Sequence, residues 1–388
     1  YEHLHGRNGD ETLWRVPVTV RRAGIPETFT FLMEERHVTR SLGVGRLPDP
    51  KDWAKVNAGQ TGFYRVNYPP EEWERLRSAI EALEMSATDR LGLQNDAYAL
   101  TRGGFIPATL FLSITEAYRN EKDATVWREV SNNLRAFETI LADEAYLPQF
   151  YAFARRLYQP TAGRIGWDSR PSDKHLDALL RSTVLGCLGS YEDSQTIREA
   201  VARFEAYLED RASLHPDLRD VVLNLTGQEG DRSVYDTLWE LEREATLNEE
   251  KVRLLMALTR PKREELLRET LERSLSEEVR SQDTVFVVAG VASNRHGRES
   301  AWEFIKDNWA EFDRRYGRGG LDGLTYLVSV TGAFTTLERA EEVEEFFRTH
   351  PVPAARRTVQ QSLERIRLNA KWLEQNRGEL ADWFATRD

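Results

Sequence analysis

The alternation of apolar and polar residues divides the chain into a short strand-like beginning and a long helical remainder. Alternation with the period of a half-buried strand covers residues 14–20, 28–33 and 63–68. In the first segment it places Trp14, Val16, Val18 and Val20 on one face. Pro17 within that segment predicts an edge strand or a bulge. We therefore expect a small antiparallel sheet within the first 68 residues.

At Pro69-Pro70-Glu71 the period becomes helical, because proline suits the first helical position and acidic residues suit a helix N-terminus. Apolar stripes at intervals of three and four residues predict helices at 73–83, 302–312 and 363–373. We expect further helices at residues 93–102, 126–141, 176–188, 197–208, 235–244, 252–259, 264–275 and 337–347. Proline- and glycine-containing segments predict connections at 159–171, 215–217, 227–230, 316–323 and 350–353.

This pattern predicts a mainly α fold with a small β domain. A dozen or more helices with brief connections are typical of stacked helical hairpins, as in a HEAT- or armadillo-like α-superhelix. No strict repeat period is present. We expect a β domain at residues 1–68 and an α-helical superhelical domain at 69–388.

Composition narrows the functional classes. Lys and Arg number 53 against 64 Asp and Glu, a net charge of −11 that disfavours nucleic acid as a partner. The apolar run at 285–292 is too short to span a membrane. One cysteine, Cys187, fits a reducing compartment, so we expect a cytoplasmic location. The chain begins at Tyr1, which predicts a piece of a longer protein.

Isolated residues do not predict a self-contained active site. No two histidines stand three or four residues apart, the helical spacing of zinc ligands. His3 and His5 are two residues apart in an expected frayed terminus, a weak metal-binding arrangement. Cys187 lies between apolar residues and is expected to be a buried hydrophobe and not a nucleophile. We predict no catalytic residue and no metal ligand in this chain.

Several segments in order resemble the C-terminal half of the gluzincin zinc aminopeptidases, in particular the puromycin-sensitive aminopeptidase group. The most distinctive is Gly59-Gln-Thr-Gly-Phe-Tyr-Arg-Val-Asn-Tyr68, within a match beginning at Trp53. Others are Asp89-Arg-Leu-Gly-Leu-Gln-Asn-Asp-Ala97 and Ala301-Trp-Glu-Phe-Ile-Lys-Asp-Asn-Trp309. Further matching segments lie at 166–168, 175–181, 276–284, 346–347 and 360–372.

The resemblance implies a small β-sandwich followed by a helical bowl that encloses the substrate chamber. The motifs that bind zinc and grip the substrate amine are absent here, so the zinc is expected in a separate N-terminal catalytic domain. The resemblance also implies that a basic residue receives the peptide's C-terminal carboxylate, and it points to Arg260. Arg260 precedes Pro261 at an expected helix end, where a cation can instead complement the helix dipole.

Two functions stay open at this point. In the first, the chain is the non-catalytic C-terminal portion of an aminopeptidase that removes single N-terminal residues, and it is inactive alone. Its partners are then the N-terminal catalytic domain and peptide substrates, and its domain-facing surface should be apolar and exposed. In the second, the chain is a free-standing α-solenoid scaffold that binds peptides or partner proteins.

Overall fold

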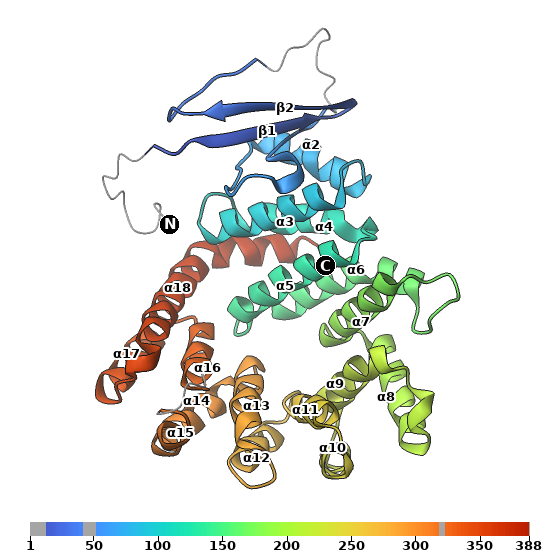
Figure 1. Cartoon of the computed structure of the whole chain (residues 1–388), viewed down its shortest axis with the longest axis vertical. Helices are drawn as coiled ribbons and strands as arrows, with labels where there is room; N and C mark the ends of the chain where they lie inside the picture. The colour runs from blue at the N-terminus through green and yellow to red at the C-terminus, as the bar shows by residue number, and fades with distance from the viewer. Residues whose placement is uncertain (1–12, 42–51, 318–322, 388) are drawn as a thin grey trace. The chain divides into compact units, whose positions relative to one another are not determined.

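The computed structural model describes residues 13–41, 52–317 and 323–387 (Figure 1). Most of these residues are helical, and the only strands among them form one small antiparallel sheet. The predicted mainly α fold with a small β part is confirmed. His3 and His5 lie outside the described residues.

The sheet has three strands in the order β2-β1-β3, and both pairings are antiparallel. Its strands are β1 (Val16–Arg22), β2 (Ile25–Met33) and β3 (Ala54–Val56). Val18 and Val20 are buried as the alternation predicts, whereas Trp14 is 77% exposed and precedes the strand. Pro17 lies on the central strand, at a position that β2 pairs but the short β3 does not reach.

The strand expected at residues 63–68 is not present. Burial does alternate there, with Val66 and Tyr68 inside and Phe63 and Arg65 outside. The segment pairs with no strand, because side chains hold it instead: the Tyr68 hydroxyl accepts a hydrogen bond from the backbone N–H of Val56 at 3.1 Å. The third strand is β3, which is too short to give a periodic signal. A second sheet, needed for the expected sandwich, does not occur among the described residues.

The chain forms two compact units, and each is described by itself. The first unit comprises residues 1–135, 156–180 and 376–388, and the second comprises 136–155 and 181–375. Helices are α2 (Pro70–Glu81), α3 (Ala87–Arg102), α4 (Ala108–Glu116), α5 (Ala124–Leu141), α6 (Leu147–Ile165), α7 (His175–Ser190), α8 (Ser194–Glu209), α9 (Arg219–Glu229), α10 (Arg232–Glu244), α11 (Asn248–Ala257), α12 (Glu264–Ser274), α13 (Ser281–Ser293), α14 (Arg298–Asp307), α15 (Trp309–Tyr316), α16 (Gly323–Ser329), α17 (Leu337–Thr349) and α18 (Arg356–Ala385). Short 3₁₀ turns include η1 (Ala58–Gln60) and η2 (Ala117–Asn120).

In the first unit, α2 and α3 form the base on which the sheet and η1 pack. Helix α2 starts at Pro70 with Glu71 and Glu72 in its first turn, as the sequence predicts. Helix α3 starts at Ser86, whose hydroxyl accepts a hydrogen bond from the N–H of Asp89 at 3.2 Å. These starts fix which side chains of α3 face the preceding loop.

In the second unit, alternate helices form two layers. Helices α9, α11, α13 and α16 contact one another in turn, while α8, α10, α12 and α14 pack against them. This alternation is the arrangement expected of stacked helical hairpins. That the hairpins form a HEAT- or armadillo-like superhelix remains a prediction, and so does the domain boundary between residues 68 and 69.

The apolar stripe at 302–312 belongs to two helices and not one. Helix α14 ends at Asp307 and α15 begins at Trp309, with Asn308 between them at φ −108° and ψ 16°. Trp302, Trp309 and the other stripe residues are nevertheless buried in one core. The stripe therefore predicts the buried residues correctly, but it wrongly predicts one helix where the structure has two.

The expected connection at 159–171 is also partly wrong, because Pro160 lies inside α6. Neighbouring side chains on α6 are buried, including Tyr158 at 0% and Thr161 at 1% exposure. Burial of this face offsets the lost backbone hydrogen bond at the proline. The sequence pattern did not predict α4, α6, α9, α13 or α16; α13, for example, is too evenly apolar to show a stripe.

No helix among the described residues combines the length and apolar character required to cross a membrane.

Candidate functional site

Metal-ligating side chains do not cluster within the described residues. No group of three or more His, Cys, Asp or Glu is arranged there to hold a metal ion. Cys187 is buried at 3% exposure, as the sequence predicts. The candidate sites are therefore the loop formed by the distinctive motif and the surroundings of Arg260.

The motif loop, which we define as residues 57–65, is fixed by an unusual backbone. Asn57, Gly59 and Gln60 all have positive φ, at 56°, 69° and 55°. For each of the two non-glycine residues this conformation costs about 1 kcal/mol. The Asn57 side chain holds the loop closed: its Nδ2 donates to the carbonyl of Gly62 at 2.9 Å, and its Oδ1 accepts from the N–H of Gly62 at 2.8 Å.

One face of α3 holds the other side of the motif loop. Asp89 accepts a hydrogen bond from the N–H of Gly59 at 2.7 Å. Seven residues further along the helix, Asp96 pairs with Arg65 at 3.3 Å. Gly92 lies between them, and a Cβ there would stand 1.7 Å from the Gln60 amide nitrogen. The helix therefore needs two carboxylates and a glycine on this face.

A buried lysine lies beneath the loop. Lys55 on β3 is 0% exposed, and its ammonium donates to the carbonyls of Val56 at 2.5 Å and Asn57 at 3.3 Å. Burial lowers the pKa of Lys55, and the carboxylates of Asp89 and Asp96 oppose that shift. Burial raises the pKa of Asp96, whose Oδ2 has no hydrogen-bond partner among the described residues.

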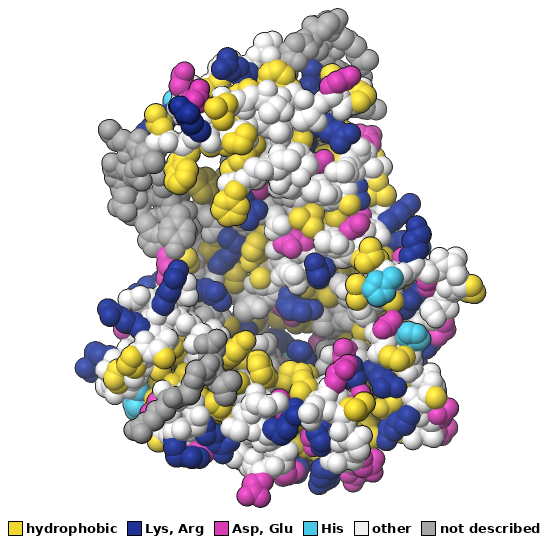
Figure 2. All heavy atoms as spheres, viewed as in Figure 1, with side chains coloured by type: hydrophobic (Ala, Val, Ile, Leu, Met, Phe, Trp, Pro, Cys, Tyr) yellow, Lys and Arg dark blue, Asp and Glu magenta, His cyan; other side chains and the backbone are white. Residues whose placement is uncertain are grey.

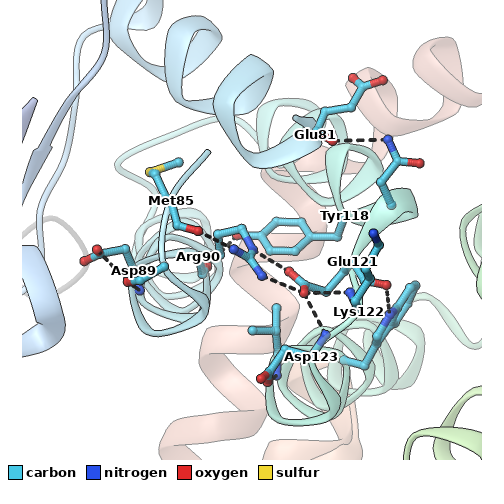
Figure 3. A network of polar contacts seen from close by, with 12 residues as sticks. Glu81, Met85, Asp89, Arg90, Tyr118, Glu121, Lys122 and Asp123 are labelled. Carbon is cyan, nitrogen blue, oxygen red and sulfur yellow. Dashed lines mark hydrogen bonds and ion pairs between the residues drawn. The ribbon is translucent and has the colours of Figure 1, made fainter. Parts of the chain in front are cut away.

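The opposite side of α3 carries a buried ion pair that anchors the helix (Figure 3). Nε and Nη2 of Arg90 donate to the two carboxylate oxygens of Glu121 at 2.6 and 2.8 Å, and Nη1 donates to the carbonyl of Met85. Glu121 Oε1 also accepts from the N–H groups of Lys122 and Asp123. Because each charge has several hydrogen-bond partners within this buried network, we interpret the network as structural.

Arg260, the predicted carboxylate-binding residue, is exposed just beyond the end of α11. The backbone on both sides of it is fixed by one side chain, since Asn294 Nδ2 donates to the carbonyls of Thr259 at 3.0 Å and Pro261 at 2.8 Å. The N–H of Arg260 donates to the carbonyl of Ala257 at 3.1 Å. Arg260 thus extends from a rigid turn, but the structure does not test its binding role.

Other cations lie on the two loops that meet at this turn. Lys262 pairs with Glu192 at 2.8 Å and with Glu229 at 2.6 Å. Arg295 donates from Nε to Nε2 of His296 at 3.2 Å. Burial lowers the pKa of His296, and the positive charges of Arg295 and Lys262 lower it further.

Arg298, at the start of α14, is the most buried cation of this region. Arg298 is 7% exposed, and its Nε has no hydrogen-bond partner among the described residues. Burial lowers the pKa of Arg298, while Asp143 and Glu138 act in the opposite direction. Positive charge therefore gathers around the Arg260 turn, partly balanced by carboxylates, which is an environment suited to an organic anion.

The sequence analysis did not identify the residues that support the motif loop and the Arg260 turn. The spacing of seven between Asp89 and Asp96 does predict a shared helix face, and was a usable signal. Nothing in the sequence marks Lys55 as buried or Asn294 as the residue that fixes the Arg260 turn, because both depend on contacts between distant segments.

A small antiparallel sheet on a helical base, together with a unit of layered helices, places the chain among mainly α proteins with large helical surfaces. Comparison with known families makes this specific. Residues 53–368 match the family described as ERAP1-like C-terminal domain, and the chain belongs to that family.

The relatives are aminopeptidases. Aminopeptidase M1-A of Oryza sativa subsp. japonica is 38% identical over 376 residues, covering 94% of this chain and 42% of the relative. Aminopeptidase M1 of Arabidopsis thaliana is 33% identical, covering 94% of this chain and 43% of the relative. Aminopeptidase A of Gloydius brevicauda is 29% identical, covering 96% and 39%. The chain thus spans less than half the length of these relatives, and its resemblance to the C-terminal part of M1 aminopeptidases is confirmed.

Proposed function

We propose that this chain is the non-catalytic C-terminal portion of a cytoplasmic zinc aminopeptidase that removes single N-terminal residues from peptides. The observation that carries the proposal is the match of 94% of this chain to 42% of an aminopeptidase. Zinc and its ligands then belong to the remainder of the complete polypeptide. The chain's own contribution is to enclose the substrate chamber and to limit which peptides enter.

Within that role, Arg260 binds the C-terminal carboxylate of the peptide. A guanidinium donates two parallel hydrogen bonds to a carboxylate, and the Asn294 contacts hold the turn that carries it. Arg295, on the loop that meets this turn, adds to the attraction for an anion, whereas Lys262 is already paired with Glu192 and Glu229. The side chain of Arg260 is exposed, which makes it accessible to a peptide.

Peptides that differ only at the C-terminus test the role of Arg260 in the complete polypeptide. Arg260→Ala should raise KM about 10-fold or more for a peptide with a free carboxylate, the usual effect of losing a charged hydrogen bond. The same peptide with a C-terminal amide should be cleaved equally by both forms. Arg263→Ala, which alters another exposed arginine of the same loop, is the matched control. An equal effect on both peptides would refute carboxylate binding.

A free-standing scaffold is the alternative function, and the layered helices of the second unit are compatible with it. Adding the N-terminal portion of the aminopeptidase to this chain in trans separates the two proposals. Restored hydrolysis of an amino-acyl reporter supports the aminopeptidase role. Indifference of the reporter signal to this chain supports the scaffold.

A further inference from the structure

The motif loop is held more firmly than its surface position requires. Three segments fix it: α3 through Asp89, β1 through Thr19, and the loop itself through Asn57. Thr19 Oγ1 donates to the carbonyl of Ala58 at 3.1 Å and lies 3.4 Å from the hydroxyl of Thr61. Non-glycine residues in left-handed conformations persist where surrounding contacts enforce them, and such places are commonly functional.

At the tip of this loop, one large apolar side chain has no cover. Phe63 is 110% exposed, more than any other large apolar residue among those described. Its neighbours Thr61 and Arg65 are also exposed. A single exposed aromatic is ordinary on a flexible loop, but here the backbone of Gly62 is held by Asn57 and the side chain of Arg65 pairs with Asp96. A fixed loop with a protruding aromatic residue surrounded by polar groups is typical of an interface anchor.

The sheet beside the loop also has partly exposed apolar side chains on its strand β2. Ile25, Phe29 and Leu32 of β2 are 38%, 38% and 45% exposed. Thr30, the partner of Thr19 in the sheet, points to the same face as Leu32, so Leu32 lies on the face that adjoins the motif loop. Phe29 pairs with Val20 and lies on the opposite face. Figure 2 shows hydrophobic side chains gathered over the part of the molecule where Figure 1 draws β1 and β2.

We propose that the motif loop is the docking element for the remainder of the complete aminopeptidase, with Phe63 inserted into an apolar pocket of that partner. This inference rests on the proposed function. We choose this partner because the chain covers only 42% of its relative. More than half of such a protein therefore lies outside the part that this chain represents and remains to be packed. The pocket has an apolar floor and a hydrogen-bond acceptor at its rim, placed to meet Arg65, whose side chain is 55% exposed.

The loop's rigidity has a thermodynamic use in such a contact. A loop already fixed before docking loses little conformational freedom on docking, so more of the gain from burying Phe63 is retained. The residues of the motif loop are consistent with this role. Some adopt the left-handed conformation or contact α3, and Phe63 points outward.

Hydrogen exchange tests the proposal, using this chain alone and the complete polypeptide. Amide exchange in residues 61–65 should be at least about 10-fold slower in the complete polypeptide, because docking buries the loop tip. Phe63→Ser should remove most of that protection and leave the thermal midpoint of this chain alone unchanged. Leu337→Ser, at another exposed apolar residue that is 56% exposed, should preserve the protection.

Equal exchange of residues 61–65 in both proteins would overturn the docking role of Phe63. Slower exchange in this chain alone as its own concentration rises would identify a second copy as the occupant, and would also overturn the proposal. Hydrolysis of an amino-acyl reporter by the complete polypeptide is measured on the same samples. An active polypeptide with an unprotected loop refutes only the docking role, whereas an inactive one refutes the proposed function.

Discussion

At the scale of single residues, the buried charges fall into two kinds. Arg90 and Glu121 satisfy one another and the adjacent backbone, so their charges are stabilised in place. Lys55 and Arg298 are buried with weaker compensation, and burial lowers the pKa of each. The first kind holds the fold, while the second lies under the motif loop and near the Arg260 turn, the two places to which we assign function.

The Arg90–Glu121 pair gives a prediction about stability. Arg90→Met should lower the free energy of unfolding by about 3–5 kcal/mol, because it leaves a buried carboxylate without its cation. Arg90→Met combined with Glu121→Gln should be more stable than Arg90→Met alone. The exposed pair Arg348–Glu345 is the control, where Arg348→Met should cost less than about 1 kcal/mol. Urea denaturation of the three variants and of the unchanged chain measures these losses, and equal losses at the two pairs would contradict the assignment.

His296 gives a prediction about pH. Its pKa in the folded state lies below the ordinary value of 6.5, because of burial and two nearby cations. The folded state therefore binds this proton more weakly than the unfolded chain does, and protonation favours unfolding. The stability that neutral His296 contributes should be present above pH 6.5 and lost as the pH falls below it. His296→Gln should flatten this decline in denaturation midpoints between pH 7 and pH 5, roughly the range in which histidine titrates; an unchanged slope would refute the role of His296.

At the scale of elements, the sequence predicts which residues are buried better than it predicts strand pairing and helix boundaries. Alternation at 63–68 correctly places Val66 inside but wrongly implies a strand, because period two reports burial and not backbone pairing. The stripe from Trp302 to Phe312 identifies core residues across a helix break at Asn308. The Arg260 turn was located as a helix end, but the Asn294 contacts that fix it depend on a residue 34 positions away and have no local signal.

Two helical glycines give a matched prediction about helix packing. A Cβ at Gly227 in α9 would lie 2.6 Å from the carbonyl oxygen of Ala257 at the end of α11, so Gly227→Ala should destabilise by about 1–3 kcal/mol. A Cβ at Gly163 in α6 would meet nothing within 4 Å, so Gly163→Ala should stabilise by about 0.5–1 kcal/mol. Thermal unfolding of the two variants should shift in opposite directions. A shift in the same direction would show that the α9–α11 contact is looser than described.

At the scale of the whole molecule, the chain has a large helical part, a sheet with exposed apolar residues and no metal-binding cluster among residues 13–41, 52–317 and 323–387. Its relatives are aminopeptidases that are more than twice as long. The family match and the length of the relatives support the proposal that the chain shapes substrate access in a longer protein. The motifs predicted the family and the hydrophobic pattern predicted the fold class, whereas the geometry of the motif loop emerged only from the fold.

The most direct measurement is hydrolysis of an amino-acyl fluorogenic reporter by this chain and by the complete polypeptide, each with and without a zinc chelator. The account predicts no turnover above buffer for this chain, and turnover by the complete polypeptide that the chelator abolishes and added zinc restores. Chelator-sensitive turnover by the purified chain alone would contradict it.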